Sequence, residues 1–188
     1  MNRFAPLHNL NGNAEGPGFY NNVGSNKVLS DSAIKQDKRK IVIIGDSHVR
    51  DCAAKLKRYL CRKCSVIGHV KPGAGMKQIV NSGKEEINNL KGDDVIVVWG
   101  GSYDICKQNS QGALKHLHKF ANIYKDVNVI VMPAPQRYDL MPSSCVNSEV
   151  IRFNRLMKKS MKLYTNTTIL ETDLNRDCFT RHVFTRIL

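Results

Sequence analysis

Buried strands and amphipathic helices alternate along most of this chain of 188 residues. The first continuous run of β-branched residues covers positions 41–44 and ends at Gly45. Such runs are typical of strands that are buried on both faces, as in parallel sheets covered by helices. Comparable runs predict further strands over residues 65–70, 94–99, 127–132 and 167–171.

Apolar residues between the predicted strands recur every three or four positions, which is the spacing of an amphipathic helix. Val49, Ala53 and Leu56 show this spacing directly after the first strand. The same pattern predicts helices over residues 76–90, 111–126 and 146–164. Because strand and helix alternate, the sequence predicts a three-layer α/β/α sandwich with a mainly parallel sheet of about five strands.

Residues 1–38 differ from the rest of the chain because they are rich in Asn, Gly and Ser and show no sustained apolar period. Segments of this composition cannot bury enough apolar surface to fold. We therefore expect a disordered tail over residues 1–38. Residues 39–188 are long enough to form one folded domain with a sizeable core.

The chain is strongly basic, with a formal net charge of +13 and a sequence pI of about 9.6. Residues 39–188 hold 25 Lys and Arg side chains against 13 Asp and Glu. A basic surface attracts polyanions such as nucleic acids. Alternatively, the charge only keeps the protein soluble. The sequence supports polyanion binding and solubility equally.

One group of basic residues recurs at regular spacing along the sequence. Basic side chains recur at three- and four-residue spacing on the predicted helix 146–164: Arg152, Arg155, Lys159 and Lys162. We take them as candidates for binding nucleic acid or an anionic membrane surface. The alternative is an ordinary solvated outer face of the helix.

Hydropathy and cysteine usage predict an intracellular protein, cytoplasmic or nuclear, that is not secreted. No apolar run approaches the roughly 20 residues of a membrane span. The first residues also lack the apolar core of a secretory signal. Six cysteines without such a signal are typical of free thiols in a reducing compartment.

No cofactor or metal is predicted. The glycine-rich stretch at residues 73–75 has Gln78 where a dinucleotide-binding loop needs its third glycine. The pair formed by Cys61 and Cys64 lacks a second Cys or His pair at zinc-binding spacing.

Open α/β sheets place their chemistry beyond the carboxyl ends of the strands. In this chain that rule selects Ser47, Gly73, the loops 100–106 and 133–145, and the segment after Asp173. Ser47 is the first candidate, because a serine between a strand and a helix can present its hydroxyl beside exposed backbone N–H groups. A helix N-cap is the alternative role for this serine.

Several short blocks resemble the ordered blocks of the SGNH, or GDSL-type, hydrolases. They are GDS at residues 45–47, PG at 72–73, GGSYD at 100–104 and the segment from Asp173 onward. The amino-acid sequences of three blocks are most similar to one branch, the SGNH-like domains of animal non-LTR retrotransposon open reading frames. These blocks are GDSH (45–48), VWGG (98–101) and FTRH (179–182). The resemblance implies a flavodoxin-like SGNH hydrolase fold and a serine esterase that acts on a small acyl ester.

The resemblance also implies roles for single residues. Ser47 would be the nucleophile, and Gly73 would donate its backbone N–H to the oxyanion. An asparagine of the third block is a further donor in the family, and this chain has Tyr103 at that position. Losing one such donor typically costs about 10²–10³ in rate. The family's base is a late histidine where this chain has Thr185, and His182, three residues earlier, is the candidate substitute.

Two other histidines adjoin the predicted cleft. His48 follows Ser47, but as the expected first residue of a helix it is predicted to point away from that serine. His69 ends the predicted second strand, where it can face the cleft. For each of them, an ordinary and partly exposed histidine is the alternative.

These patterns lead to two functional hypotheses. The first is an SGNH-type ester hydrolase of retrotransposon origin that is catalytically impaired, a pseudoenzyme, because Tyr103 and Thr185 replace two functional residues of the family. The second is a non-catalytic basic domain that binds nucleic acid or a protein partner. Since the chain stops at Leu188, before the family's closing helix, the resemblance also implies a C-terminally truncated fold.

Overall fold

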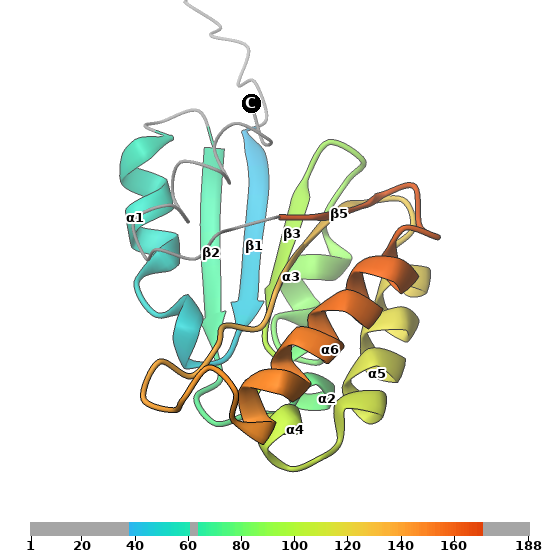
Figure 1. Cartoon of the computed structure of the whole chain (residues 1–188). Helices are drawn as coiled ribbons and strands as arrows, with labels where there is room; N and C mark the ends of the chain where they lie inside the picture. Colours follow the sequence, from blue (N-terminus) through green and yellow to red (C-terminus); the bar gives the residue numbers. More distant parts are fainter. Residues whose placement is uncertain (1–37, 61–63, 171–188) are drawn as a thin grey trace, which may run out of the picture. The chain divides into compact units, whose positions relative to one another are not determined.

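The computed structural model describes residues 38–60 and 64–170 (Figure 1). The predicted tail lies outside these ranges except for Lys38, and so do the candidate base His182 and the position Thr185. Within the described ranges, strands and helices alternate from residue 39 to residue 169.

The centre of the fold is one sheet of five parallel strands in the order β2-β1-β3-β4-β5. The strands are β1 (Arg39–Gly45), β2 (Cys64–Val70), β3 (Val95–Trp99), β4 (Asn128–Met132) and β5 (Thr167–Ile169). This order is that of flavodoxin-like folds. The predicted parallel sheet is therefore confirmed.

Helices cover both faces of this sheet, as the alternating pattern predicts (Figure 1). The helical segments are the 3₁₀ turn η1 (Ser47–Val49), α1 (Cys52–Tyr59), α2 (Met76–Ile79), α3 (Lys84–Asn88), α4 (Ser102–Cys106), α5 (Ser110–Ile123) and α6 (Cys145–Met161). α1 packs on the face that receives Ile41 and Ile43. The opposite face receives Val42 and Ile44 and is covered by α2 to α6.

β1 belongs to both apolar cores. Residues 41–44 are each at most 1% exposed. Because successive side chains of a strand point to opposite faces, this run supplies apolar groups to both helical layers. Each such side chain contributes about 1.5–3 kcal/mol by its burial. The β-branched run thus marks a doubly buried strand, as predicted.

The single helix predicted over residues 76–90 is wrong, because the chain forms α2 and α3 there instead. Gly83 has a φ of 68°, in the left-handed region that glycine adopts without strain. This conformation separates the two helices. Ile79 and Ile87 are buried on either side of the break, so the apolar spacing continues across it and conceals it.

Two smaller corrections concern the carboxyl edge of the sheet. The chain forms η1 before α1, and Asp51 between them has a φ of 64°, so the first helix does not follow β1 directly. Residues 100–106, predicted as a loop, contain α4. The Asp46 carboxylate caps η1, and Gly101, with a φ of 108°, precedes α4. The spacing of apolar residues indicates neither feature.

Gly45→Ala tests how closely the end of β1 is packed. An added Cβ would lie 2.3 Å from the Trp99 carbonyl oxygen and 2.5 Å from a Val49 methyl carbon. We expect this overpacking to lower the free energy of unfolding by about 1–3 kcal/mol, measured in urea. The matched control is Gly92→Ala, whose Cβ would meet nothing closer than 3.7 Å and should change stability by at most about 0.5 kcal/mol. Equal effects of the two substitutions would contradict this packing.

Candidate functional site

The candidate site lies beyond the carboxyl ends of β1 and β3. The chain order reverses between these two strands, at the switch point where open α/β sheets hold ligands. A cavity of about 250 Å³ opens there. Ser47, Gly73 and Tyr103 all line it, although they follow three different strands.

The turn after β1 places Ser47. Asp46 donates its N–H to the Trp99 carbonyl, 3.2 Å away, and so ties the end of β1 to the end of β3. The Asp46 carboxylate caps η1 by accepting the N–H of His48 at 3.0 Å. Ser47 is the first residue of η1 and is exposed. The N-cap role considered for Ser47 is therefore wrong, because Asp46 fills it.

The loop after β2 places Gly73. Lys71 donates its N–H to the Gly45 carbonyl at 2.8 Å, which anchors this loop to the turn after β1. Gly73 has a φ of 68°, whereas a Cβ added to it would meet no atom within 4 Å. Its backbone angle, rather than a lack of space, is what requires glycine.

A buried carboxylate on α4 joins this loop to the segment after β3. Asp104 is 6% exposed and accepts the N–H of Met76 at 2.7 Å. A Cβ on Gly75 would lie 2.9 Å from the same carboxylate, so glycine there permits the close approach. Burial desolvates the carboxylate and raises the pKa of Asp104, and the Met76 N–H partly opposes this shift. Sequence reasoning misses this role, although Asp104 stands within the third block.

The rest of the cavity wall is largely apolar. Ile105 of α4 and Val146 and Val150 of α6 line it. Tyr103, at its rim, is 44% exposed, and the Lys107 ammonium nitrogen lies 5.8 Å from the centre of its ring. The cavity thus combines an apolar wall with the backbone of two polar loops.

His48 also lines this cavity. Its Nδ1 lies 2.6 Å from Asp46 Oδ1, and its ring centre lies 5.8 Å from that of Trp99. His48 and Ser47 both border this cavity, and the His48 ring contacts Asp46 and Trp99. Asp46, rather than the geometry of an α-helix, orients the imidazole. The prediction that His48 points away from Ser47 stays a prediction.

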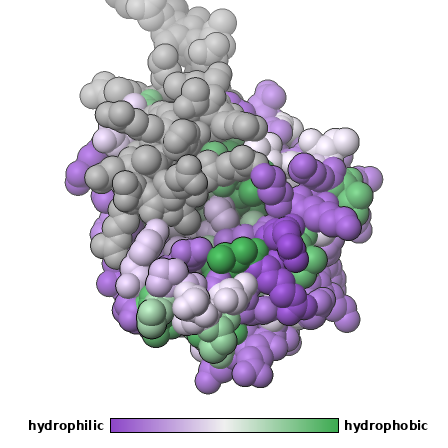
Figure 2. All heavy atoms as spheres, in the orientation of Figure 1, coloured by the Kyte–Doolittle hydropathy of each residue, from purple (hydrophilic) through white to green (hydrophobic). Residues whose placement is uncertain are grey.

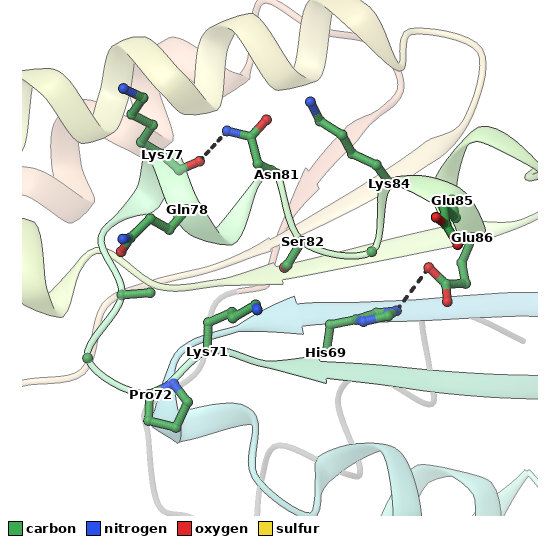
Figure 3. Close-up of a pocket in the computed structure, with 13 residues that line it drawn as sticks. His69, Lys71, Pro72, Lys77, Gln78, Asn81, Ser82, Lys84, Glu85 and Glu86 are labelled. Carbon is green, nitrogen blue, oxygen red and sulfur yellow. Dashed lines mark hydrogen bonds and ion pairs between the residues drawn. The ribbon is translucent and has the colours of Figure 1, made fainter.

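A larger, open depression of about 1010 Å³ adjoins the cavity at Gly73 (Figure 3). The lysines that line it are Lys71, Lys77 and Lys84. His69 lines this depression instead of the cavity, and its Nε2 lies 3.2 Å from Glu86 Oε2. That distance suits an ion pair, but the contact does not have the geometry of a hydrogen bond.

The basic candidate residues are exposed on α6 or directly after it, on a largely hydrophilic side of the molecule (Figure 2). They are Arg152, Arg155, Lys159 and Lys162. Arg152 pairs with Glu149, with 3.0 Å between Nη1 and Oε2. None of the four lines the cavity or the depression.

His182, Thr185 and the segment after Asp173 lie outside the described residues. Within the described ranges, no three His, Cys, Asp or Glu side chains are grouped so that they could hold a metal ion. None of the helices there is both long enough and apolar enough for a bilayer crossing.

No protein-family model and no curated protein matches this chain. Solved structures do. A member of the lipolytic protein G-D-S-L family from Veillonella parvula DSM 2008 matches with a TM-score of 0.59 and 15% identity, over 71% of this chain and 77% of that one. The C-terminal catalytic domain of peptidoglycan O-acetyltransferase A from Streptococcus pneumoniae matches with a TM-score of 0.52 and 16% identity, over 71% and 68%.

A psychrotrophic esterase from Pseudoalteromonas sp. matches with a TM-score of 0.54 and 8% identity, over 80% of this chain and 97% of the esterase. The TM-scores establish a shared fold, and with identities this low the matches establish nothing finer. The chain therefore has the α/β fold of the GDSL-type, or SGNH, hydrolases, as the block order predicts.

Asp104→Asn tests the buried carboxylate that joins the loops. The amide keeps an oxygen that can accept the Met76 N–H, but it cannot ionise. Because the folded-state pKa of Asp104 is raised above 3.8, the folded protein holds this proton more tightly than the unfolded chain. Wild-type stability relative to the variant should therefore be lowest at neutral pH and rise as the pH falls through the folded-state pKa. Urea unfolding across this range measures the difference, and a pH-independent difference would contradict the assignment.

Proposed function

We propose that residues 39–188 form an SGNH-type serine ester hydrolase domain of retrotransposon origin, with impaired catalysis. The observation that carries this proposal is the single cavity lined by Ser47 and Gly73. Likeness of fold to a lipolytic protein and to an esterase supports the chemistry. The amino-acid sequences of the blocks at 45–48 and 98–101 support the proposed retrotransposon origin.

In this proposal the Ser47 hydroxyl oxygen attacks the carbonyl carbon of a small acyl ester. The resulting oxyanion needs hydrogen-bond donors that are already in place. The backbone N–H groups of Ser47 and Gly73 fill that role. Neither donates a hydrogen bond to another residue within the described ranges.

The size of the cavity favours a short acyl group. Its volume of about 250 Å³ lies just below the range of about 300–1,000 Å³ typical of sites for drug-sized ligands. Ile105, Val146 and Val150 give it an apolar wall. A short hydrocarbon chain fits the apolar part of this wall, whereas Gln136 and Arg137 add polar groups to the lining.

Impaired turnover follows from two replaced residues. Tyr103 stands where the family has an asparagine donor, and a phenol offers one O–H at a longer reach than a carboxamide. Thr185 stands where the family has its base, and a hydroxyl does not accept a proton usefully at neutral pH. We therefore expect slow hydrolysis by Ser47.

The state of the cysteines supports the proposed intracellular location, cytoplasmic or nuclear. Cys52, Cys64, Cys106 and Cys145, the cysteines within the described ranges, are all free thiols. Free thiols are typical of proteins in reducing compartments.

Hydrolysis of p-nitrophenyl acetate tests the enzymatic proposal. Wild-type protein should exceed Ser47→Ala, which leaves only the background rate. Tyr103→Asn restores the family's donor and should raise kcat by up to about 10²-fold, while Tyr103→Phe should not. Equal rates for wild type and Ser47→Ala would end the proposal.

A second candidate function is the binding of nucleic acid through α6. Arg155, Lys159 and Lys162 are exposed, and none forms an ion pair with a residue of the described ranges. Cations that are not already paired can neutralise phosphates and release their counterions. This function needs no catalysis and is compatible with an impaired site.

The salt dependence of single-stranded RNA binding tests this second function. Each phosphate contact adds about 0.7 to the steepness of log K against log salt concentration. Replacing Arg155, Lys159 and Lys162 by Gln should therefore reduce the steepness by about 2. Fluorescence anisotropy at several salt concentrations measures it. Binding that does not depend on salt, or a triple variant with an unchanged slope, would exclude α6 as the interface.

A further inference from the structure

His48 is held in a fixed orientation beside Ser47. Its Nδ1 lies 2.6 Å from Asp46 Oδ1, and its ring is tilted by 30° from the plane of Trp99. The Asp46 side chain is 5% exposed, whereas the His48 side chain is 36% exposed. One edge of the imidazole is thus tied to a buried carboxylate, while the residue borders the cavity that Ser47 also lines.

The contact with Asp46 selects the position of the proton on the neutral ring. An ionised carboxylate can only accept a hydrogen bond, so Nδ1 carries the hydrogen and Nε2 keeps its lone pair. Within the described ranges, the hydrogen bond of the ring is made through Nδ1. A carboxylate that orients a histidine in this way is the arrangement that activates serine nucleophiles.

We propose that His48 is the general base for Ser47, an inference that rests on the ester-hydrolase function proposed above. His48 Nε2 takes the hydroxyl proton directly or across one water molecule. Asp46 is the positioning residue, because it acts through the imidazole. His48 thereby supplies the proton acceptor that Thr185 cannot be.

His48 Nε2 takes up a proton and releases it again in each half of the reaction. As the Ser47 proton moves to Nε2, the hydroxyl oxygen bonds to the carbonyl carbon and the π electrons move to the carbonyl oxygen. Collapse of this oxyanion breaks the bond to the alcohol, which leaves with the proton from Nε2. A water molecule then gives a proton to Nε2 and bonds to the acyl carbon. The acid leaves, and the proton returns to Ser47, while Asp46 stays ionised and stabilises the imidazolium.

A purely structural role is the competing explanation, in which His48 only clamps the turn through Asp46. His48→Asn separates the two roles, because the amide nitrogen of asparagine can replace Nδ1 as the donor while no atom replaces Nε2. His118→Asn is the matched control. His118 lies on α5, where its Nδ1 is 3.1 Å from the Tyr164 hydroxyl, and it lines neither the cavity nor the depression.

A fluorophosphonate carrying a fluorophore measures the reactivity of Ser47 without requiring turnover. The serine oxygen bonds to phosphorus, fluoride leaves, and the proton goes to the base. We expect wild type and His118→Asn to be labelled at the same rate, and Ser47→Ala not at all. His48→Asn should be labelled at least about 10²-fold more slowly. His48→Ala should regain part of the wild-type rate when imidazole is added.

The outcomes distinguish the two proposals. Equal labelling of wild type and His48→Asn overturns the base role and leaves the ester-hydrolase proposal standing. A wild type that is not labelled overturns both. Thermal unfolding shows whether each variant folds, and if His48→Asn does not, imidazole rescue of His48→Ala decides instead. A folded His48→Ala that imidazole does not rescue overturns the base role.

Nitrogen-15 NMR of the His48 ring gives a readout that does not depend on activity. For the neutral ring we expect hydrogen on Nδ1 and a bare Nε2, because Asp46 accepts from Nδ1. Asp46→Asn should weaken this preference. A neutral ring protonated on Nε2 would leave that nitrogen without the lone pair that accepts the Ser47 proton, and it would overturn the base role.

Discussion

The arrangement of the site depends on one hydrogen bond between neighbouring strand ends, from the Asp46 N–H to the Trp99 carbonyl at 3.2 Å. This bond draws the turn after β1 onto the end of β3. Gly45 makes the approach feasible, because any Cβ there would meet the same carbonyl. The contact places the Asp46 carboxylate beneath η1, leaves Ser47 exposed, and brings His48 against the Trp99 ring.

Two buried carboxylates extend this constraint to the other loops. Asp46 accepts from the turn after β1, and Asp104 accepts the Met76 N–H from the loop that carries Gly73. A buried carboxylate is costly unless it is hydrogen-bonded, so each one fixes the backbone that satisfies it. Both lie at the edge of a doubly buried sheet, and rigid elements of this kind hold a reactive geometry better than free loops.

How far the sequence predicts this structure depends on the kind of contact involved. The strand at residues 41–44 is predictable, because burial on both faces requires a continuous apolar run. That Ser47 and Gly73 line one cavity is also predictable, because parallel sheets place ligand sites beyond the carboxyl ends of their strands. The break at Gly83 is hidden, because apolar spacing continues across it. The orientation of His48 depends on Asp46 and on a Trp99 that is distant in sequence, so no local pattern reports it. The roles of His182 and Thr185 stay predictions, because these residues lie outside the described ranges.

The central claim is that the Ser47 hydroxyl and the Ser47 and Gly73 N–H groups act on one acyl group. A crystal structure of the protein after reaction with a phosphonate ester tests this claim most directly. We predict a covalent bond from Ser47 to phosphorus, with a phosphonyl oxygen about 2.7–3.1 Å from both N–H groups. An adduct on another residue, or a phosphonyl oxygen that points into solvent, would contradict the claim.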